Sequence, residues 1–419
     1  MCTKEKTATW LASIQQTKAK RLTQDCKVFE LKLDYSHLSK EKLGYLRLLF
    51  LEAKWLYNSV LGCDNVFKYD TKLKTVLVKN KEQQFESREL KQLSSQMRQG
   101  IKQRICNSIK ALSTKKKNNV GGVGQLKFKS RLNAIVLNQF GITYKFEKGG
   151  KYFKLQGFSK PIKVIGYKQI PANAELANAT LCRSPAGYFL KVTCFVAKQE
   201  KVFKEQAVGI DFGIATSLTL STGEKHDVCF PVSKRTRRLQ RRTRHAIRGS
   251  ANYYKGKRRI ANSILATTNS KKDKQNKIVS AIVNRFETIV VQQESIKSWQ
   301  AGRYGRKINA SGIGGIMVAL KTKAHTLITV DKFFPSTQLC PSCSALNKHD
   351  LSQRVYFCAC GYSQDRDVHA AQNILREGLK TLTIPMEYRY FKPVEIKSST
   401  LSASWDDARP VVDAGSLCL

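Results

Sequence analysis

Four cysteines in the C-terminal third of the chain could bind a metal ion. They lie in the segment LCPSCSALNKHDLSQRVYFCACGYSQDRDVHAAQNIL, residues 339–375, as two tight pairs: Cys340 and Cys343, then Cys358 and Cys360. Four thiolates are enough to hold one Zn²⁺ tetrahedrally, and C-x-x-C is a usual chelating turn. The second pair is one residue shorter than that. We expect one structural zinc; free cytosolic thiols are the weaker explanation, and His349 is a weaker candidate for one of the four ligands.

Three carboxylates are expected at the ends of secondary-structure elements. Asp211 ends the apolar stretch AVGID, Glu294 follows the apolar stretch FETIVV, and Asp367 stands at the start of a helical pattern. Reactive groups gather outside the carboxyl ends of strands in parallel sheets. Three acids there would hold two Mg²⁺, which activate water and stabilise the leaving oxygen in phosphodiester cleavage. A single Asp after a strand more often belongs to a turn, so the prediction depends on the ordered trio.

A basic segment lies between the first two acids. Residues 234–259, KRTRRLQRRTRHAIRGSANYYKGKRR, contain twelve Lys or Arg and no acid. Such a segment repels itself, so a phosphate backbone is favoured over a solvated helix face. Tyr253 and Tyr254 could stack on bases or belong to a core. The candidate nucleic-acid contacts are Lys234, Arg235, Arg237, Arg238, Arg241, Arg242, Arg244, Lys257, Arg258 and Arg259.

The composition also predicts a polyanionic partner. The chain has 419 residues, with 74 Lys and Arg against 31 Asp and Glu, a net charge of +43. Hydrophobic residues make up 42%, which indicates a globular chain. A charge this large favours nucleic acid over a merely soluble basic protein. We find neither a long apolar run nor a signal peptide, so we expect no membrane partner and no disulfide framework.

The elements that position these residues fall into three regions. We expect residues 1–26 to be loosely ordered and the tail from 383 to be disordered. A strand at 27–34 is followed by helices at 40–60, capped by Ser39, and at 87–112. Short strands then predict a small β-barrel or sandwich, which the first strand can join: 126–136, 142–148, 152–155, 162–165 and 188–197. The last region alternates strands and helices: strands at 207–211, 214–220, 286–291 and 327–330, with a helix at 312–323.

Several of these motifs together resemble one family. The order GIDFG (209–213), IVVQQESIKSWQ (289–300), GIGGIM (312–317), CPSC, CACG and DRDVHAAQNIL resembles TnpB, the transposon-encoded RNA-guided DNA endonucleases ancestral to compact type V CRISPR effectors. The likeness covers about residues 27–375. It implies an α+β multidomain fold: a β-barrel wedge domain with a helical recognition insertion, then a RuvC-like (RNase H-type) α/β nuclease domain with a zinc-ribbon insertion.

The resemblance implies domain boundaries in this chain. They are an N-terminal segment with the first wedge strand (1–36), a helical recognition insertion (37–120), a wedge barrel (121–203), a nuclease domain (204–335), a zinc-binding target-nucleic-acid module (336–363), the rest of the nuclease (364–382) and a disordered tail (383–419).

The resemblance also implies roles for the site residues. Asp211, Glu294 and Asp367 match the catalytic, Mg²⁺-binding acids. Asp367 is chosen over Asp365 because the family acid directly precedes the pattern x-N-A-A-x-N-I. In this chain His369 replaces the usual Asn, Ser344 stands where Gly is common, and CACG is one residue short.

The implied partners are a guide RNA made from the transposon end and double-stranded DNA cut beside a short adjacent motif. The implied cofactors are two Mg²⁺ and one Zn²⁺. We expect a monomer in the cytoplasm, associated with the nucleoid of a prokaryotic cell. The alternatives are a compact type V CRISPR effector and a nuclease-silent RNA-guided repressor; the intact acids count against the latter. A plain zinc-ribbon DNA-binding protein or a strand transferase fits the motifs less well.

Overall fold

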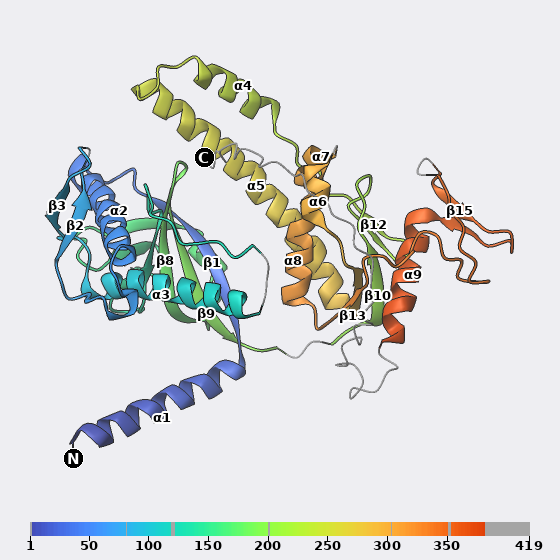
Figure 1. Cartoon of the computed structure of the whole chain (residues 1–419), viewed down its shortest axis with the longest axis horizontal. Helices are drawn as coiled ribbons and strands as arrows, with labels where there is room; N and C mark the ends of the chain where they lie inside the picture. Colours follow the sequence, from blue (N-terminus) through green and yellow to red (C-terminus); the bar gives the residue numbers. More distant parts are fainter. Residues whose placement is uncertain are drawn as a thin grey trace, which may run out of the picture. The chain divides into compact units, whose positions relative to one another are not determined.

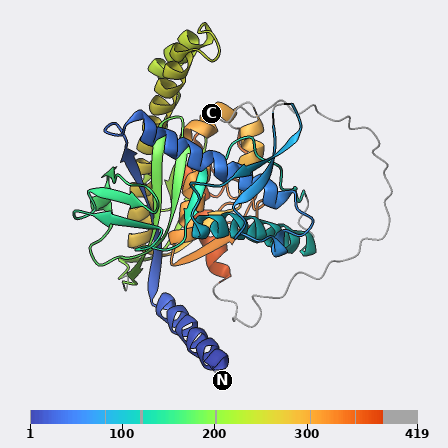
Figure 2. The ribbon, with the colours of Figure 1, turned by 90° about the vertical axis from the view of Figure 1, so that its left-hand side faces the viewer.

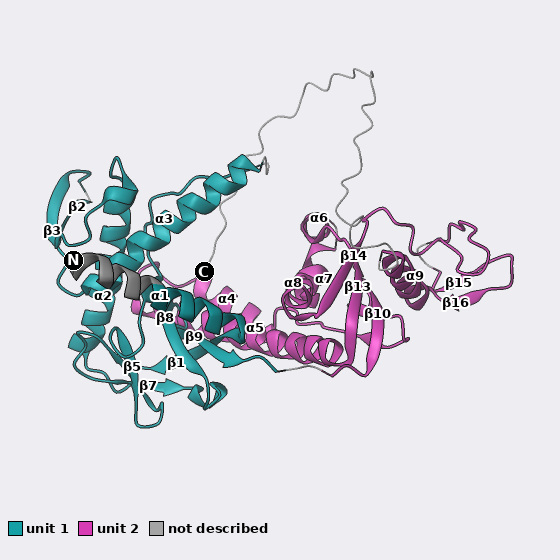
Figure 3. Cartoon of the chain, turned by 90° about the horizontal axis from the view of Figure 1, so that it is seen from below, with its two compact units in different colours: residues 1–199 teal, residues 200–419 magenta. Residues whose placement is uncertain are grey.

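The computed structural model describes residues 2–80, 82–118, 122–199, 202–302, 304–350 and 353–381, with side chains from residue 12 onward. Its contacts divide the chain into two units, residues 1–199 and 200–419 (Figure 3). The predicted disordered tail, 383–419, lies outside the described residues.

The first unit is built on a seven-stranded antiparallel sheet that is nearly closed. Its order is β4-β8-β9-β1-β7-β6-β5. The Tyr144 hydroxyl, on one edge strand, donates a 2.8 Å hydrogen bond to the carbonyl of Ala177 in β8, next to the other edge. The strands are β1 (Gln24–Asp34), β4 (Ala134–Leu137), β5 (Tyr144–Glu147), β6 (Tyr152–Leu155), β7 (Ile162–Ile165), β8 (Glu175–Ser184) and β9 (Gly187–Ala197). Strand β1 pairs with β7 and β9, so the predicted insertion between the first strand and the rest is confirmed.

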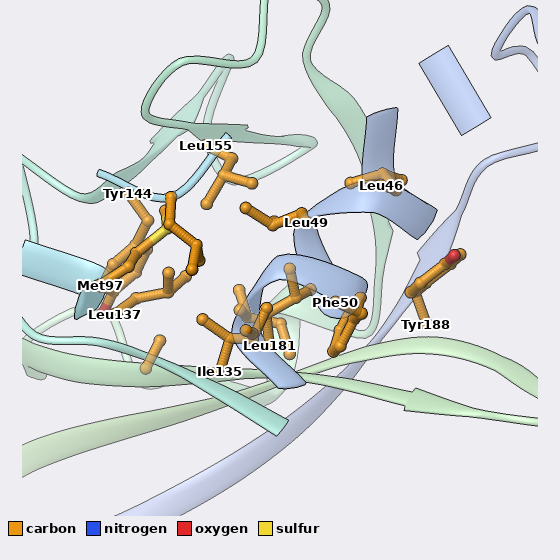
Figure 4. Close-up of a cluster of buried hydrophobic side chains, with 14 of the residues drawn as sticks. Leu46, Leu49, Phe50, Met97, Ile135, Leu137, Tyr144, Leu155, Leu181 and Tyr188 are labelled. Carbon is orange, nitrogen blue, oxygen red and sulfur yellow. The ribbon is translucent and has the colours of Figure 1, made fainter. Parts of the chain in front are cut away.

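The insertion packs one face of two helices onto this sheet. Helix α2 (Lys40–Leu61) begins at the predicted cap, where the Ser39 side chain accepts from the amide of Lys42. Helix α3 (Ser95–Lys117) contributes Met97 at 0% exposure. Figure 4 shows Leu49, Phe50 and Met97 meeting sheet residues in one core. Each fully buried Leu, Phe or Met side chain contributes roughly 1.5–3 kcal/mol, so this face holds the insertion in place.

A buried carboxylate fixes the loop between the two helices. Glu52 of α2 is 4% exposed and accepts hydrogen bonds from the amides of Lys91, Gln92 and Leu93. Burial raises the pKa of Glu52, and the three amides oppose that rise. The loop follows a hairpin of β2 (Thr75–Lys79) and β3 (Phe85–Glu89). The predicted start of the second helix at residue 87 is therefore wrong, because residues 87–89 belong to β3 and α3 begins at Ser95.

Two other expectations for this unit are wrong. Residues 1–26 were expected to be loose, but α1 (Cys2–Leu22) is a helix that runs directly into β1 (Figure 2). Its sequence contains no Gly or Pro and many good helix formers, so intrinsic propensity prevails over the missing amphipathic period. The strand at 126–136 is confined to β4, and β8 was missed because ELANATLCRS lacks a clear alternation. Short single-turn 3₁₀ segments lie at Val66–Lys68 and Tyr167–Gln169.

The second unit contains a five-stranded sheet with parallel strands at its centre. Its order is β12-β11-β10-β13-β14. Strand β10 (Glu205–Asp211) pairs in parallel with β13 (Phe286–Gln292), and β13 pairs in parallel with β14 (Thr326–Val330). Strands β11 (Leu218–Leu220) and β12 (Lys225–His226) extend the sheet in antiparallel fashion. The sheet thus has a defined carboxyl edge, where β10 and β13 end side by side.

Helices cover both faces of this sheet (Figures 1 and 3). Helix α5 (Ala251–Arg285) and α8 (Ile313–Lys323) share one core with Ile289 and Val291, whereas Val290 points into the other core, with Ile374 of α9 (Arg366–Lys380). A strand buried on both faces must be apolar at successive positions, which explains the run in FETIVV. Short helices α6 (Ile296–Ala301) and α7 (Gly305–Ser311) precede α8.

Helix α9 lies unusually close to the sheet. A Cβ at Gly209 of β10 would overlap the carbonyl oxygen of Ala371 in α9, and a Cβ at Gly378 would overlap the Val290 side chain. Glycine at these two positions therefore lets the helix approach the strands. The consequence is that the first turn of α9 is held beside the carboxyl end of β10.

Candidate metal and nucleic-acid sites

The four predicted cysteines come together in space. Their sulfur atoms all lie within 4.8 Å of one another. The sulfur atoms of Cys340 and Cys360 are 3.5 Å apart, and so are those of Cys343 and Cys358. Tetrahedral Zn²⁺ with Zn–S bonds of about 2.3 Å needs sulfurs about 3.8 Å apart. The quartet fits zinc, and among the described residues it is the one such group of His, Cys, Asp or Glu.

Backbone geometry supports the quartet. Burial raises the pKa of the Cys340 thiol, but hydrogen bonds from the backbone amides of Cys343 and Ser342 lower it to about 6 overall. The shorter second pair lies in the hairpin of β15 (Val355–Phe357) and β16 (Ser363–Asp365). Asn347 donates a 3.1 Å hydrogen bond to the Cys358 sulfur. His349 is not part of the group, and its Nδ1 lies 3.2 Å from the side-chain oxygen of Gln353.

The three predicted acids lie at the carboxyl edge of the second sheet and at the adjoining helix. Asp211 is the last residue of β10, and Glu294 follows two residues after β13. Asp367 is in the first turn of α9. All three are half-buried. They are close enough to interact through their charges, although they are not gathered as tightly as the cysteines.

The electrostatics of Asp211 reflect this arrangement. Burial, and then the negative charges of Asp367 and Glu294, raise the pKa of Asp211 to about 7. Burial also raises the pKa of Glu294, while the positive charge of Lys332 lowers it. Like charges held together out of water favour either a proton or a cation between them. The donor set is hard carboxylate oxygen, which suits Mg²⁺.

The neighbouring acid, Asp365, has a different environment. Its side chain caps α9 by accepting from the amides of Asp367 and Val368, each at 3.1 Å. It also forms a 2.8 Å ion pair with Lys225. Burial raises the pKa of Asp365, but the Lys225 hydrogen bond and the helix amides lower it overall. Its carboxylate already accepts three hydrogen bonds, which favours Asp367 over Asp365 as the third acid.

A set of buried polar residues joins these two sites, and sequence reasoning missed it. Gln292, at the end of β13, donates to the carbonyls of Asp331, Lys332 and Phe334. Asn373 of α9 donates to the carbonyls of Ser336 and Leu339, at 2.8 and 2.7 Å. Both hold the segment that leads from β14 to Cys340.

His369, one of the departures from the family pattern, joins the same two sites. It is fully buried and stacks on Tyr356 of the cysteine hairpin, with ring centroids 3.8 Å apart and planes 14° apart. Burial lowers the pKa of His369 to about 4, so the ring is neutral at pH 7. Its Nε2 lies 3.1 Å from Asn373 Nδ2. The hairpin therefore packs directly on the helix that carries Asp367.

The predicted basic residues form an exposed helical hairpin. Helix α4 (Lys234–Arg244) packs on the N-terminal part of α5 through Thr236, whose hydroxyl lies 2.7 Å from that of Ser263 (Figure 1). The ten candidate contacts are exposed, except Lys257, which is half-buried. Among the described residues, the cations of α4 have no carboxylate within 4.0 Å. Tyr254 is 62% exposed, whereas Tyr253 is half-buried beside it.

Two family models match the parts of the chain that carry these sites. The model described as "Probable transposase" matches residues 190–297, and the model described as "Cas12f1-like, TNB domain" matches residues 317–374. The first match contains Asp211 and Glu294, and the second contains the cysteine quartet and Asp367. These matches agree with the resemblance of the chain to the TnpB family.

Proteins similar to this chain include one of Streptomyces pristinaespiralis named as an RNA-guided DNA endonuclease. It is 31% identical over 233 residues, which is 53% of this chain and 58% of the relative. A protein of Acanthamoeba polyphaga mimivirus named as a transposase is 25% identical over 203 residues, 41% of this chain and 40% of the relative. The chain thus matches about three fifths or less of the length of these curated relatives.

A solved complex of Cas12f1 with single-guide RNA and target DNA aligns with 80% of this chain and 83% of its own, with a TM-score of 0.42 and 15% identity. No helix in the described part of the chain is long and apolar enough to cross a membrane.

Proposed function

We propose that this chain is a TnpB-family RNA-guided endonuclease that cleaves double-stranded DNA. The observation that carries the proposal is the set of three acids: Asp211 ends a central strand, and burial together with the charges of Asp367 and Glu294 raises its pKa. In this proposal residues 204–335 and 364–382 form a RuvC-like nuclease, the nearly closed sheet is the wedge domain, and residues 336–363 are a zinc ribbon.

Asp211, Glu294 and Asp367 would hold two Mg²⁺. When bound, such a pair activates water and stabilises the leaving oxygen of a phosphodiester. The half-buried, mutually repelling carboxylates fit this role because a divalent cation removes their repulsion. The four cysteines would hold one Zn²⁺, and through His369 and Asn373 the zinc module would keep the start of α9 in position.

The proposed partners follow from charge and from the relatives. The exposed cations of α4 and α5 suit phosphate backbones. The Streptomyces relative is named as RNA-guided, and we assign the same kind of partner to this chain: a guide RNA from the transposon end, whose pairing selects the DNA target beside a short motif. We propose that the chain acts as a cytoplasmic monomer.

The direct test is to express the chain with its native flanking DNA and sequence the RNA that purifies with it. The complex is then programmed with a guide and given matching duplex DNA in Mg²⁺. We expect one RNA species rich in transposon-end sequence and cleavage only of the matched duplex. A complex that binds the matched duplex but does not cut it would favour the nuclease-silent repressor. Guide RNAs from a neighbouring repeat array would favour the CRISPR effector.

A further inference from the structure

An exposed aromatic ring stands next to the proposed acid site. Phe333, in the loop after β14, is 84% exposed, whereas its neighbour Phe334 packs into the core with Val330 and Ile374. Because a phenyl ring gains free energy when it is buried, an outward ring contributes little to the stability of the fold.

The loop that carries the ring is firmly held. Gln292, itself 6% exposed, donates to the Asp331, Lys332 and Phe334 carbonyls, and its own oxygen accepts a 2.9 Å hydrogen bond from the Ser336 hydroxyl. The Asp331 carboxylate accepts a 2.7 Å hydrogen bond from the Phe333 amide. The ring is therefore presented from a fixed backbone.

The same contacts place the loop beside one of the acids. Gln292 lies two residues before Glu294, and the amide of Gln293 donates a 3.0 Å hydrogen bond to the carbonyl of Val330, just before the loop. Lys332 is close enough for its charge to act on Glu294. A DNA strand bound at Glu294 would therefore lie near this loop.

The ring also has a cation at its side. The Lys332 ammonium lies 5.3 Å from the centroid of the Phe333 ring. An aromatic face combined with a nearby cation is the arrangement that binds single-stranded nucleic acid: the base stacks on the ring and the cation attracts the backbone phosphate. Stacking tolerates any base, which suits an enzyme whose sequence choice comes from guide pairing.

We propose that Phe333 stacks on a nucleobase of the DNA strand held at the acids, with Lys332 binding the adjoining phosphate. The inference deepens the proposed endonuclease function and rests on it. Phe333 is then a substrate-positioning residue that fixes the strand beside Asp211, Glu294 and Asp367.

The variants separate stacking from apolar contact. Phe333→Leu keeps the apolar volume but removes the aromatic face, and Phe333→Trp keeps the face. Phe85→Leu is the matched control, because Phe85 is 71% exposed on the β2–β3 hairpin of the other unit. All are prepared as complexes with guide RNA, and cleavage of prebound target DNA is followed in single-turnover reactions.

Loss of one base–aromatic stacking contact costs about 1–3 kcal/mol. Phe333→Leu should therefore slow cleavage about 5- to 150-fold. Target affinity should stay unchanged because guide pairing supplies it. Phe333→Trp and Phe85→Leu should cleave like the wild type. Wild-type cleavage by Phe333→Leu overturns the proposal. Loss in both Phe333→Leu and Phe333→Trp also overturns it, because it would indicate a shape-specific protein contact.

A second measurement does not depend on cleavage. A single 2-aminopurine is moved along the target strand and its fluorescence recorded in EDTA. We expect quenching near the cut position in the wild type and in Phe333→Trp, and brighter fluorescence there in Phe333→Leu. This difference in a complex that never cleaves would leave the stacking inference standing while the endonuclease proposal fails. Equal fluorescence at every position in wild type and Phe333→Leu would overturn the stacking.

Discussion

At the scale of single residues, small departures from the family pattern have visible structural consequences. Ser344, which stands where Gly is common, has φ 61°, in the left-handed region that L side chains rarely adopt. His369, in place of Asn, fills a buried site against Tyr356 with an aromatic ring. The first departure strains the cysteine turn, whereas the second adds packing between that module and α9.

We predict that Ser344→Gly stabilises the cysteine module. Glycine adopts this φ without a Cβ clash, so the change should add about 1 kcal/mol. Slower loss of zinc to a chelator and a higher melting temperature would check this. Ser342→Gly is the control, because Ser342 lies in the same turn without positive φ, and it should not stabilise. A less stable Ser344→Gly would show that the hydroxyl has a role that the strain argument ignores.

At the scale of elements, the cysteine hairpin packs directly on α9. The Tyr356–His369 stack and the Asn373 hydrogen bonds lie between the four thiols and Asp367. Metal binding to such thiols is coupled to folding of the surrounding chain. We therefore expect loss of zinc to destabilise the first turn of α9.

We predict that Cys340→Ser lowers zinc content below one ion per chain and slows cleavage without altering an acid. Elemental analysis, single-turnover cleavage and hydrogen exchange of residues 366–374 are the measurements. Faster exchange in that segment is expected. Cys229→Ser is the matched control, because Cys229 is an exposed cysteine outside the quartet. Full zinc content and normal exchange in Cys340→Ser would contradict the assignment.

The junction of α1 with the first sheet gives a pH-dependent prediction. Arg21 and Lys20 each hold a carboxylate oxygen of Glu175 at 2.8 Å, and these contacts lower the pKa of Glu175 to about 2. A lowered folded pKa means that the stabilisation is complete above about pH 4.5 and is lost as pH falls toward 2.

We predict that Glu175→Gln lowers the melting temperature at pH 7 and that the difference shrinks at pH 3. The carboxylate is 39% exposed, so screening limits the effect to about 1 kcal/mol or less, a few degrees for a unit of this size. Calorimetry at both pH values measures it. A difference that is the same at pH 7 and pH 3 would show that charge pairing is not its cause.

Much of the element order could be predicted from the sequence. The apolar run of β13 and the Ser39 cap are local patterns with local causes. The hydrogen bonds that Gln292 and Asn373 donate to the segment between β14 and Cys340 could not be predicted. Their partners are backbone carbonyls, which have no sequence signature. The same holds for Glu52, whose three amide donors lie about forty residues away. Only the tertiary arrangement reveals such contacts.

At the scale of the whole molecule, a net charge of +43 favours a polyanionic partner. Helix α4 is the clearest concentration of that charge, because its cations are exposed and have no carboxylate within 4.0 Å among the described residues. Near the α4–α5 bend, Arg242, Lys255 and Arg259 line a cavity of about 790 Å³.

We predict that changing Arg237, Arg238, Arg241 and Arg242 to Glu weakens nucleic-acid binding and flattens its salt dependence. Each lost phosphate contact removes about 0.9 from the slope of log K against log salt for duplex DNA. The same four positions changed to Lys keep the charge and serve as the control. An unchanged slope in the Glu variant would mean that this helix only faces solvent.

The central claim is that the three acids are needed for DNA cleavage and not for binding of the guide RNA or the target DNA. Asp211→Ala, Glu294→Ala and Asp367→Ala are compared in guide-programmed cleavage in Mg²⁺ and in target binding in EDTA. Each should lower the cleavage rate by several orders of magnitude while RNA and target binding persist. Asp365→Asn, which keeps the helix cap, should cleave nearly as well as the wild type. Full cleavage by Asp367→Ala would reject that residue, and full cleavage by all three would contradict the account.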